Sequence, residues 1–500
     1  MKHLKIILII GLAVGFLSNT YSQRFPYPQH TEYAGAHIKP SQYTQEELDN
    51  HLTTFYDKWK AKYLVNGCED NQYYIFFDSG NTVTVSEAMG YGMMIIPLMA
   101  GYDADAKTYF DGLYRYYKAH PSHINPHLMA WKQITGCVNS DGPDSATDGD
   151  IDIAFGLLLA HAQWGSWNEI NYFQEAVDMI NAIMEDDIHN DYFSVKLGDW
   201  VSSGSYARGT RTSDFIFDHF RLFQCATNDA NWNTVIDTSY YFLQQMQENY
   251  SPETGLLPDF IEDVNTSPRP ADPDFLEGED DGHYSYNACR DPWRLATDYL
   301  IYGEERAQTI TQKINRWLLE STDGNTSNIK SGYDLDGEPN AYWQDLSFIA
   351  PFTVGAMTDI ENQEWLDDLY AKTLSMSFNG GGYYGNSLKL LSMLTISGNY
   401  WVPSCDLMNG IGHINHEKQS IFNCYPTLAK NHIKIEFNNT HLINNYLIII
   451  TNELGERVLN TNTNNPNINT SSLNPGLYFV SAINKQSMKM VQTEKIIISE

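Results

Sequence analysis

The residues best suited to chemistry in this chain are acids at the starts of two apolar, helix-like segments. The first segment is SATDGDIDIAFGLLLAHAQW, residues 145–164, which carries three acids at alternate positions: Asp148, Asp150 and Asp152. The apolar residues that follow recur at helical spacing, so the acids fall in or just before the first helical turn. The second segment, VSEAMGYG, residues 85–92, places Glu87 at the mouth of another helix. Carboxylates at the starts of two helices can face the same cleft. General acid–base catalysis uses carboxyl groups positioned in this way.

Two structural roles compete with catalysis for these acids. Thr147 or Asp148 could simply cap a core helix, because short polar side chains satisfy the free N–H groups of a first turn. A calcium loop of the EF-hand type needs Gly where Ile153 stands and a Glu further on, and the sequence offers neither. The presence of Glu87 at a second helix end favours catalysis over both alternatives.

The N-terminal residues predict export. A charged start, an apolar run over residues 6–17 and small polar residues ending at Ser22 have the pattern of a signal peptide, residues 1–22. The apolar run is too short to cross a bilayer, and no other stretch of 18 apolar residues occurs. We therefore expect no membrane span in the mature protein.

Composition narrows the class of partner. The chain carries 31 basic against 62 acidic residues, a formal charge of −31, which would repel a nucleic acid. Its six cysteines lack metal-type spacing, so one or two disulfides are expected, with the pairing left open. The histidines at positions 123, 127 and 161 do not suggest a metal site, and we expect no cofactor. A chain with this negative charge is expected to bind a neutral or cationic partner.

Helical periodicity dominates residues 45–400 and predicts an all-α domain. Twelve segments have the pattern: 48–64, 84–101, 104–118, 148–163, 168–184, 213–226, 231–248, 288–301, 304–320, 344–357, 361–376 and 384–397. Short links such as residues 101–103 alternate with long loops, which pairs the helices into antiparallel hairpins. We therefore predict an (α/α) six-hairpin toroid whose long loops line a groove. A helical solenoid is the alternative, although no internal repeat supports it.

The composition changes after about residue 420. Residues 421–500 contain 15 Asn and a nearly balanced charge, with 5 acids against 6 bases. Four strand-like runs separated by turn signals predict a small all-β sandwich: His432–Phe437, Tyr446–Thr451, Leu477–Ala482 and Lys495–Ser499. We expect a first domain over residues 23–405, a linker over 406–420 and this second domain over 421–500.

Three segments resemble the signature blocks of glycoside hydrolase family 8, whose members are secreted, inverting β-1,4-glycanases built on an (α/α) toroid. The segments are SEAMGYGM (86–93), SATDGDIDIAFGLLLAHAQWG (145–165) and YNACRDPWRLATDYL (286–300). The match spans roughly residues 25–402. The resemblance implies that Glu87 is the general acid and that Asp148 holds the distorted sugar at the cleavage point. It also implies an endo-acting hydrolase with a polysaccharide substrate.

The tail resembles the C-terminal sorting domain of the type IX secretion system of Bacteroidetes. The resemblance rests on NELGERVL (452–459) and LNPGLYFV (473–480), whereas the usual Tyr-Pro-Asn-Pro opening is represented only by Tyr425-Pro426-Thr427. That system exports proteins across the outer membrane and removes this domain. The resemblance therefore implies a contact with the type IX machinery and a secreted or cell-surface location.

One position departs from the cellulase- and xylanase-like pattern of the family. Those members carry Asp as general base in a Tyr-Asp-Ala block, where this chain has Asn287, and Asn cannot take a proton from water. Members with Asn here, largely chitosanases and some lichenases, supply a Glu from a preceding loop. Residues 274–282 form such a loop and offer Glu277 or Glu279. We favour Glu277, because two apolar residues precede it and could anchor it inward, while Glu279 stands in a run of acids typical of a solvated loop.

Further residues are candidates for substrate binding. Tyr91 and Asn287 lie in the matched blocks, and Arg290 could bind sugar or orient the base, with a structural salt bridge as the alternative. Six aromatic residues are candidates for stacking on sugar rings, with burial in the core as the competing role of each: Trp131, Trp200, Tyr206, Tyr286, Trp293 and Trp343. Trp200 and Tyr206 are favoured among them, because they lie on long loops.

Charge guides the choice of polysaccharide. Residues 251–282 hold 10 acids against one base, Arg269, and such a patch beside a cleft would attract a polycation such as chitosan. We therefore predict a chitosanase, with a licheninase or an endo-β-1,4-glucanase (cellulase) as the alternative. A non-catalytic, carbohydrate-binding surface protein is the competing class, and the two acids at matched positions argue against it.

Overall fold

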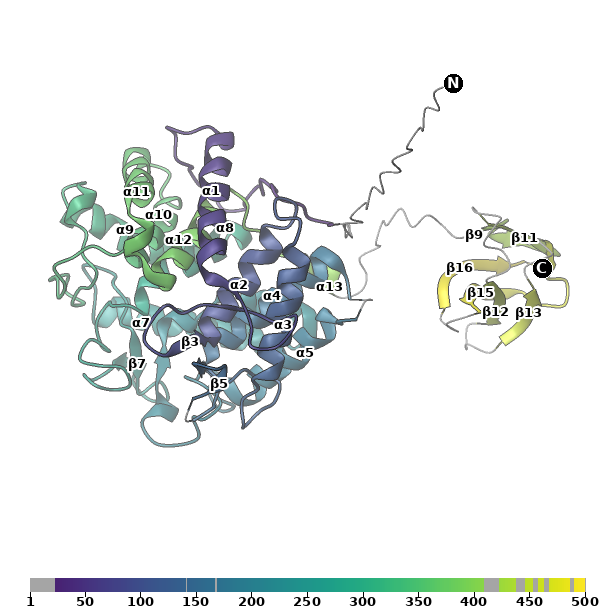
Figure 1. Cartoon of the computed structure of the whole chain (residues 1–500), viewed down its shortest axis with the longest axis horizontal. Helices are drawn as coiled ribbons and strands as arrows, with labels where there is room; N and C mark the ends of the chain where they lie inside the picture. Colours follow the sequence, from purple (N-terminus) through teal and green to yellow (C-terminus); the bar gives the residue numbers. More distant parts are fainter. Residues whose placement is uncertain are drawn as a thin grey trace, which may run out of the picture. The chain divides into compact units, whose positions relative to one another are not determined.

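The computed structural model describes residues 23–140, 142–166, 169–408, 422–437, 446–452, 457–462, 467–485 and 490–499. The chain divides into two compact units, Met1–Ile411 and Gly412–Glu500. The first unit is mainly helical and the second is rich in β-strands, which confirms that part of the predicted fold (Figure 1). The predicted signal peptide, residues 1–22, lies outside the described residues, as does most of the predicted linker, residues 406–420.

Six helices form the inside of the larger unit. They are α2 (Ser86–Leu98), α4 (Thr147–Trp164), α6 (Phe217–Thr227), α8 (Asp291–Tyr302), α10 (Leu346–Ala356) and α12 (Gly382–Ile396). Each packs against the next in chain order, and α12 packs against α2, so that the series of contacts closes on itself. Helices α2, α4 and α10 bury nearly every residue, because a helix surrounded by protein has no face that must be polar.

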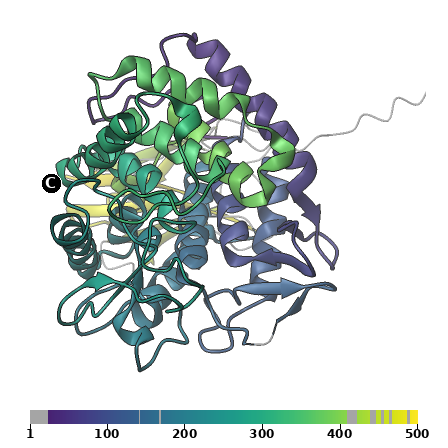
Figure 2. The same ribbon diagram turned by 90° about the vertical axis from the view of Figure 1, so that its left-hand side faces the viewer.

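Six more helices cover the inner ones from outside. They are α1 (Gln45–Tyr63) on α12, α3 (Ala106–Ala119) on α2, α5 (Tyr172–Ala182) on α4, α7 (Asn231–Asn249) on α6, α9 (Glu305–Ser321) on α8 and α11 (Gln363–Ser375) on α10. These helices bury one stripe only; α9, for example, buries Ala307, Ile310 and Ile314 at spacings of three and four. Figure 2 shows α1, in purple, beside light-green helices at the top of the view, where the first and last helical pairs meet.

All twelve predicted helical segments are present in the described part of the larger unit, with ends shifted by a few residues. A short additional helix, α13, spans Cys405–Met408. Six single turns of 3-10 or π-helix lie between these helices: Ile183–Asp187, Tyr206–Arg208, Thr212–Asp214, Ala288–Arg290, Thr326–Asn328 and Phe378–Gly380. No described helix is long and apolar enough to cross a membrane.

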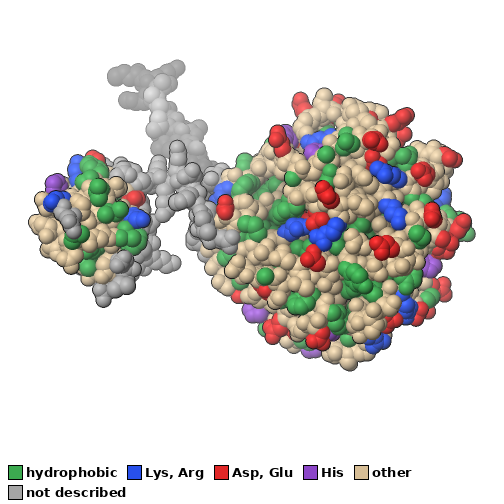
Figure 3. Space-filling model, turned by 180° about the vertical axis from the view of Figure 1, so that it is seen from behind, with side chains coloured by type: hydrophobic (Ala, Val, Ile, Leu, Met, Phe, Trp, Pro, Cys, Tyr) green, Lys and Arg blue, Asp and Glu red, His purple; other side chains and the backbone are tan. Residues whose placement is uncertain are grey.

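The long loops of the larger unit contain short antiparallel strands. Their bounds are β1 (Leu64–Asn66), β2 (Tyr73–Ile75), β3 (Thr82–Val85), β4 (Lys132–Ile134), β5 (Val138–Asn139), β6 (Thr210–Arg211), β7 (Phe260–Glu262) and β8 (Arg269–Pro270). They form a β1–β2 pair and two three-stranded sheets, β3–β4–β5 and β6–β7–β8. Strands of two to four residues give no periodic signal, so the sequence did not predict them. Figure 3 shows acidic side chains spread over the visible face of this unit.

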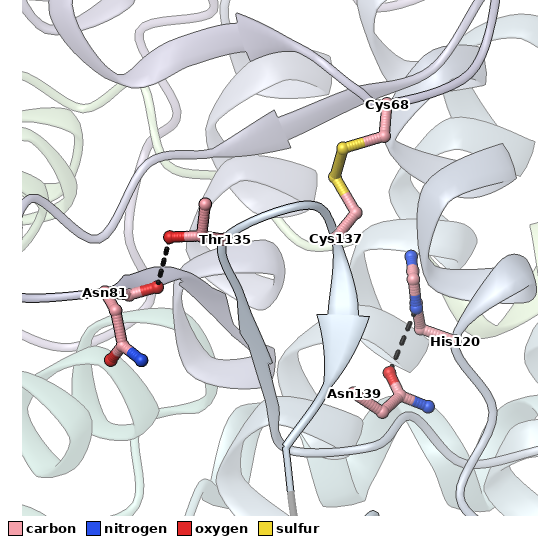
Figure 4. Close-up of a disulfide and its surroundings, with 6 residues drawn as sticks. All are labelled: Cys68, Asn81, His120, Thr135, Cys137 and Asn139. Atoms are coloured by element: carbon pink, nitrogen blue, oxygen red, sulfur yellow. Dashed lines mark hydrogen bonds between the residues drawn. A yellow bond between two sulfur atoms is a disulfide. The ribbon is translucent and has the colours of Figure 1, made fainter.

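Two disulfides fasten the larger unit. Cys68, in the turn after β1, bonds to Cys137, in the turn between β4 and β5 (Figure 4). The Thr135 hydroxyl, on the same hairpin, donates to the Asn81 carbonyl at 3.3 Å, which ties the hairpin to the start of β3. The second disulfide joins Cys225 on α6 to Cys405 at the start of α13. The sequence left the pairing of the cysteines open, and both disulfides join residues of the larger unit.

The smaller unit has two sheets around one core. Its strands are β9 (Phe422–Tyr425), β10 (Leu428–Ala429), β11 (His432–Phe437), β12 (Tyr446–Asn452), β13 (Arg457–Asn462), β14 (Asn467–Asn469), β15 (Gly476–Asn484) and β16 (Met490–Ile498). One sheet has the order β10-β16-β15-β12-β13 and the other β14-β11-β9. Alternate residues such as Ile433, Ile435, Ile448 and Ile450 point into the shared core, as expected for strands with one covered face. The four predicted strands correspond to β11, β12, β15 and β16.

Candidate active site

Glu87 and Asp148 come together because α2 and α4 pack closely at their N-termini. A Cβ atom at Gly149 would lie 2.4 Å from Ser86 Oγ, and one at Gly156 would lie 2.7 Å from a backbone carbonyl oxygen of α2. Real Cβ atoms do not approach other atoms so closely, so glycine is required at both positions. The first turns of the two helices therefore meet, with one acid on each.

Arg290 lies between these two acids. It ends the 3-10 turn Ala288–Arg290 that leads into α8. Its Nη1 donates to Glu87 Oε2 and to Asp148 Oδ2, each at 2.8 Å, and its Nη2 donates to Ser213 Oγ at 2.7 Å. The side chain is 1% exposed. Arg290 is thus a buried ion-pair partner of both acids, and its Nη2 also donates to Asn287 Oδ1 at 2.9 Å.

The environment of Glu87 favours its neutral form. Burial raises the pKa of the Glu87 carboxyl to about 7, and the negative charge of Asp148 acts in the same direction. Two contacts oppose this shift, the ion pair with Arg290 and a hydrogen bond that the Tyr383 hydroxyl donates to Glu87 Oε1. Because burial prevails, Glu87 can hold a proton at near-neutral pH and donate it.

Asp148 is kept ionised at the same depth. Burial alone would raise its pKa, but the guanidinium groups of Arg290 and Arg211 outweigh burial and hold the pKa of Asp148 below its ordinary value. Arg211 Nη1 lies 3.7 Å from Asp148 Oδ2, and the backbone N–H of Gly149 donates to Oδ1 at 2.8 Å. The site therefore pairs one protonated acid with one charged carboxylate.

Glu277 reaches the same centre from the loop that precedes the Asn287 block. Arg211 Nη2 donates to Glu277 Oε1 at 2.9 Å, and Asn287 Nδ2 donates to Oε2 at 2.9 Å. The Glu277 side chain remains 49% exposed, so water can reach its carboxylate. Glu279 is exposed as well, but no described side chain bonds to it.

The loop that carries Glu277 is held in place by hydrogen bonds and by apolar packing. The Asp281 carboxylate accepts the backbone N–H groups of Leu276, Glu277 and Gly278. Phe275 is 8% exposed and belongs to a small apolar cluster, which also contains Leu197, Val201, Phe260 and Ala271. The anchoring expected of the two apolar residues before Glu277 is therefore present in the packing of Phe275.

Asn287 acts here as a donor to the loop carboxylate. Its backbone N–H and that of Ala288 donate to Asp259, at 3.1 and 2.7 Å, and a third bond comes from the Ser285 N–H. Burial raises the pKa of Asp259 to about 7, against the effect of these N–H donors. Asp259 thus fixes the backbone that presents Asn287, and through Asn287 it helps to orient Glu277.

A cavity of about 360 Å³ opens above these groups. It is lined by Phe77, Val85, Ser86, Glu87, Trp131, Ala146, Asp148, Arg211, Glu277, Tyr286, Asn287, Tyr383 and Tyr384. Its walls combine aromatic rings with a few converging polar groups, the usual character of a ligand site. A larger polar hollow of about 710 Å³ beside residues 66–73 contains none of the acids described above.

The structure separates the aromatic candidates into three groups. Trp131 and Tyr286 line the cavity, and each is 38% exposed. Trp200 and Tyr206 lie half-buried against Phe275 and do not line this cavity, so their role in sugar binding stays a prediction.

Tyr91 and Trp293 are buried, and neither lines the cavity. Tyr91 stands one helical turn after Glu87, which directs its ring into the packing of α2, and its hydroxyl lies 3.5 Å from Arg290 Nη1. Trp343 is exposed and contacts Tyr286 from outside the cavity.

The other two acids of the first segment have structural partners. Asp150 accepts the backbone N–H of Met129 at 2.9 Å, while Asp152 pairs with Arg294 at 2.7 Å and with His219 at 3.2 Å. Both acids are fully buried. Among the described residues, no cluster of three or more His, Cys, Asp or Glu side chains has an arrangement suited to a metal ion.

Reasoning from sequence missed several residues of this site, among them Arg211, Asp259 and Tyr383. Arg211 lies on β6, Asp259 directly before β7, and Tyr383 at the start of α12. Each is a common residue type in a segment with no motif, and only the folded chain brings them to Glu87, Asp148 and Glu277. The start of an inner helix, where Glu87 and Asp148 were found, was the available signal for Tyr383.

Comparison with known proteins defines the class. Residues 49–398 match the family described as Glycosyl hydrolases family 8, and residues 423–499 match the Secretion system C-terminal sorting domain. The chain belongs to glycosyl hydrolases family 8, so the protein is a glycoside hydrolase with a C-terminal sorting domain.

Two named relatives cover most of the larger unit. A protein of Niallia circulans named Beta-glucanase is 48% identical over 376 residues, which are 75% of this chain and 91% of that one. The Endoglucanase of Bacillus sp. (strain KSM-330) is 39% identical over 404 residues, 79% of this chain and 86% of the relative.

Solved structures agree with this family. The apo structure of a Beta-1,3-1,4-glucanase from Paenibacillus sp. X4 has a TM-score of 0.74 at 48% identity, covering 76% of this chain and 99% of that one. Rex8A from Paenibacillus barcinonensis, with a TM-score of 0.62 at 21% identity, shows the fold alone.

Proposed function

We propose that the protein is an exported, endo-acting, inverting hydrolase of β-1,4 linkages in a β-glucan, of the licheninase or endoglucanase type. The observation that carries the proposal is a pair of adjacent buried acids, Glu87 and Asp148, whose surroundings shift their pKa values in opposite directions. Burial raises the pKa of Glu87 to about 7, whereas Arg290 and Arg211 hold that of Asp148 below its ordinary value. An acid that keeps its proton beside one that stays charged suits general acid catalysis at a glycosidic bond.

The roles of the three acids follow from their places. Glu87 gives its proton to the leaving glycosidic oxygen, and Glu277 takes a proton from the water that attacks the anomeric carbon from the opposite face. Inverting hydrolases separate these two carboxyl groups by roughly 6.5–9.5 Å to admit that water. Here Glu87 and Glu277 stand at the two ends of a series of ion pairs through Arg290, Asp148 and Arg211, which keeps them apart. Asp148 stabilises the positive charge that develops on the sugar.

A glucan replaces chitosan as the favoured substrate. The names Beta-glucanase and Endoglucanase of the relatives, and the Beta-1,3-1,4-glucanase title of the similar structure, support the glucan alternative and give no support to chitosan. Several of the acids that suggested a polycationic substrate form hydrogen bonds or ion pairs within the protein. Asp259 and Asp281 accept backbone N–H groups, and Asp263 and Asp272 pair with Arg269. These four of the ten acids in residues 251–282 therefore have partners within the protein.

The domain organisation belongs to the same proposal. The closed series of contacts from α2 to α12 and back supports an (α/α) six-hairpin toroid as the catalytic domain, over residues 23–405. The match of residues 423–499 to a secretion sorting domain supports export through the type IX machinery and a sorting domain at residues 421–500. Export by this route would use the signal peptide that the sequence predicts at residues 1–22. The released enzyme would act outside the cell or at its surface.

A reducing-sugar assay on soluble polysaccharides tests this proposal. The panel contains mixed-linkage β-1,3-1,4-glucan, carboxymethyl cellulose, xylan and chitosan, and the matched control is Glu87→Gln, which keeps the shape of the side chain but cannot donate its proton. We expect release from one or both glucans and almost none from the variant. Release only from chitosan would restore the first prediction, and binding without release would favour a non-catalytic carbohydrate-binding protein.

A further inference from the structure

We propose that Trp343 forms a separate sugar subsite outside the catalytic cavity, on which a β-glucan chain stacks after it passes Tyr286. This inference rests on the proposed glucanase function. It adds a residue that selects substrates by length.

Trp343 is the most exposed tryptophan among the described residues of this unit, and it stands next to Tyr342, which is more exposed still. Trp343 is 56% exposed, although Trp normally buries most of its ring because so much apolar area is otherwise left in water. It does not line the catalytic cavity, but its indole N–H donates to the hydroxyl of Tyr286, which does, at 3.2 Å. The exposed ring therefore begins where the cavity wall ends.

A series of hydrogen bonds holds this ring in place. The Tyr286 hydroxyl that accepts from Trp343 donates in turn to Asp345 Oδ2 at 3.3 Å. Asp345 caps α10 by accepting the Ser347 backbone N–H at 2.9 Å. The Trp343 carbonyl accepts both the N–H and the hydroxyl of Ser331, at 3.1 Å each. An aromatic ring fixed at its backbone and at its edge loses little entropy when a ligand covers its face.

The position and chemistry together identify the ligand as a sugar ring of the same polysaccharide. Tyr286 packs edge-on against Phe348 of α10 at 5.2 Å, so its own orientation is fixed as well. A chain bound between Trp131 and Tyr286 and leaving on the Tyr286 side next meets the indole. A β-1,4-linked glucose presents C–H groups on its faces and hydroxyls at its edge, which match an exposed ring with a polar rim. The Trp343 ring thus adds one stacking surface for a sugar ring beyond the catalytic cavity.

Removal of the Trp343 ring should weaken substrate binding and leave the rate of the chemical step unaffected. A contact remote from the cleaved bond stabilises the bound substrate and the transition state equally, so its loss raises KM without lowering kcat. Aromatic stacking of this kind contributes enough to change KM by about two- to tenfold. Short oligosaccharides that do not reach Trp343 should show no change.

The test measures kcat and KM for β-glucan oligosaccharides of increasing length, from trimer to heptamer. Trp343→Ala is compared with wild type, with Trp343→Phe, which keeps a ring but lacks the indole N–H, and with Tyr241→Ala. Tyr241 is a matched control because it is 48% exposed on the outer helix α7. We expect Trp343→Ala to raise KM for the longest substrates only, Trp343→Phe to lie between it and wild type, and Tyr241→Ala to be silent.

The outcomes separate this inference from the proposed function. Absence of hydrolysis by the wild-type protein would reject the glucanase proposal itself. A wild-type enzyme whose Trp343→Ala variant loses activity equally at all lengths, or with a lower kcat, would show that Trp343 only supports Tyr286. An unchanged KM for every length would show that the exposed ring binds no sugar. Either of these last two results overturns the subsite.

Discussion

Glu87 and Asp148 share one arginine and yet differ in protonation. Each accepts a 2.8 Å hydrogen bond from Arg290 Nη1. For Asp148, the charges of Arg290 and Arg211 and the Gly149 N–H together outweigh burial and lower the pKa, whereas for Glu87 burial and the charge of Asp148 prevail and raise it. One buried arginine is too little to keep two buried carboxylates charged, and the acid with the weaker cationic surroundings keeps its proton.

This difference predicts a pH dependence. Since burial raises the pKa of Glu87 to about 7, the protonated donor is present below that pH and is lost above it, so kcat/KM should fall as pH rises through about 7. Tyr383 donates to the ionised form, which lowers the pKa of Glu87, so Tyr383→Phe should move this alkaline limb to higher pH. The profile of kcat/KM against pH measures both effects. A limb that stayed in place or moved to lower pH in the variant would contradict the assignment of Glu87.

The identity of the base gives a second prediction at the same scale. Glu277→Gln should reduce turnover on polysaccharide by several orders of magnitude, because no other described carboxylate receives hydrogen bonds from both Arg211 and Asn287. Glu279→Gln is the matched control and should be nearly silent. Glycosyl fluorides of the opposite anomer, whose departure needs less assistance, should partly restore the rate of Glu277→Gln. Exchange of the two phenotypes would make Glu279 the base.

Among the elements, two arrangements position the acids. The close approach of α2 and α4 at Gly149 places one acid beside the other, and the packing of Phe275 with the bonds to Asp281 shapes the loop that carries Glu277. The first arrangement is between regular helices and the second is within a loop. Both rely on small or buried residues that do no chemistry themselves.

The helix crossing can be tested directly. Gly149→Ala would place a Cβ atom 2.4 Å from Ser86 Oγ and should separate the helix starts, lowering kcat and destabilising the fold. Gly380→Ala is the control, since nothing lies within 4 Å of a Cβ atom there. Thermal unfolding and kcat on a soluble glucan measure the two effects. Equal behaviour of the two variants would show that the crossing tolerates a methyl group.

Across the whole molecule, the sequence predicted those features whose pattern lies in neighbouring residues and missed those that depend on contacts between distant parts of the chain. Helices with a periodic apolar stripe and strands with alternating residues were found where expected. Glu87 and Asp148 stood out because a helix start is visible in the sequence. Arg211, Asp259 and Tyr383 were missed because their partners lie far away in the chain. Sequence alone also could not show that Trp200 and Tyr206 pack against Phe275, because an aromatic residue on a loop can turn toward a local cluster.

The division into two units predicts independence of the active site. Every residue that lines the catalytic cavity belongs to the larger unit, so a chain that ends at residue 420 should keep the kcat/KM of the full-length protein. The comparison uses purified proteins with matching circular dichroism in the helical region. A folded truncation with much lower kcat/KM would show that the smaller unit contributes to the groove.

The most direct test of the proposed mechanism is the configuration of the first product. Proton NMR during hydrolysis of mixed-linkage β-glucan distinguishes the α- and β-anomers of the new reducing end before they interconvert. Glu87 as acid and Glu277 as base for an attacking water predict the α-anomer first, because a single displacement inverts the β-linkage. The β-anomer as first product would contradict this mechanism, since it requires a covalent intermediate.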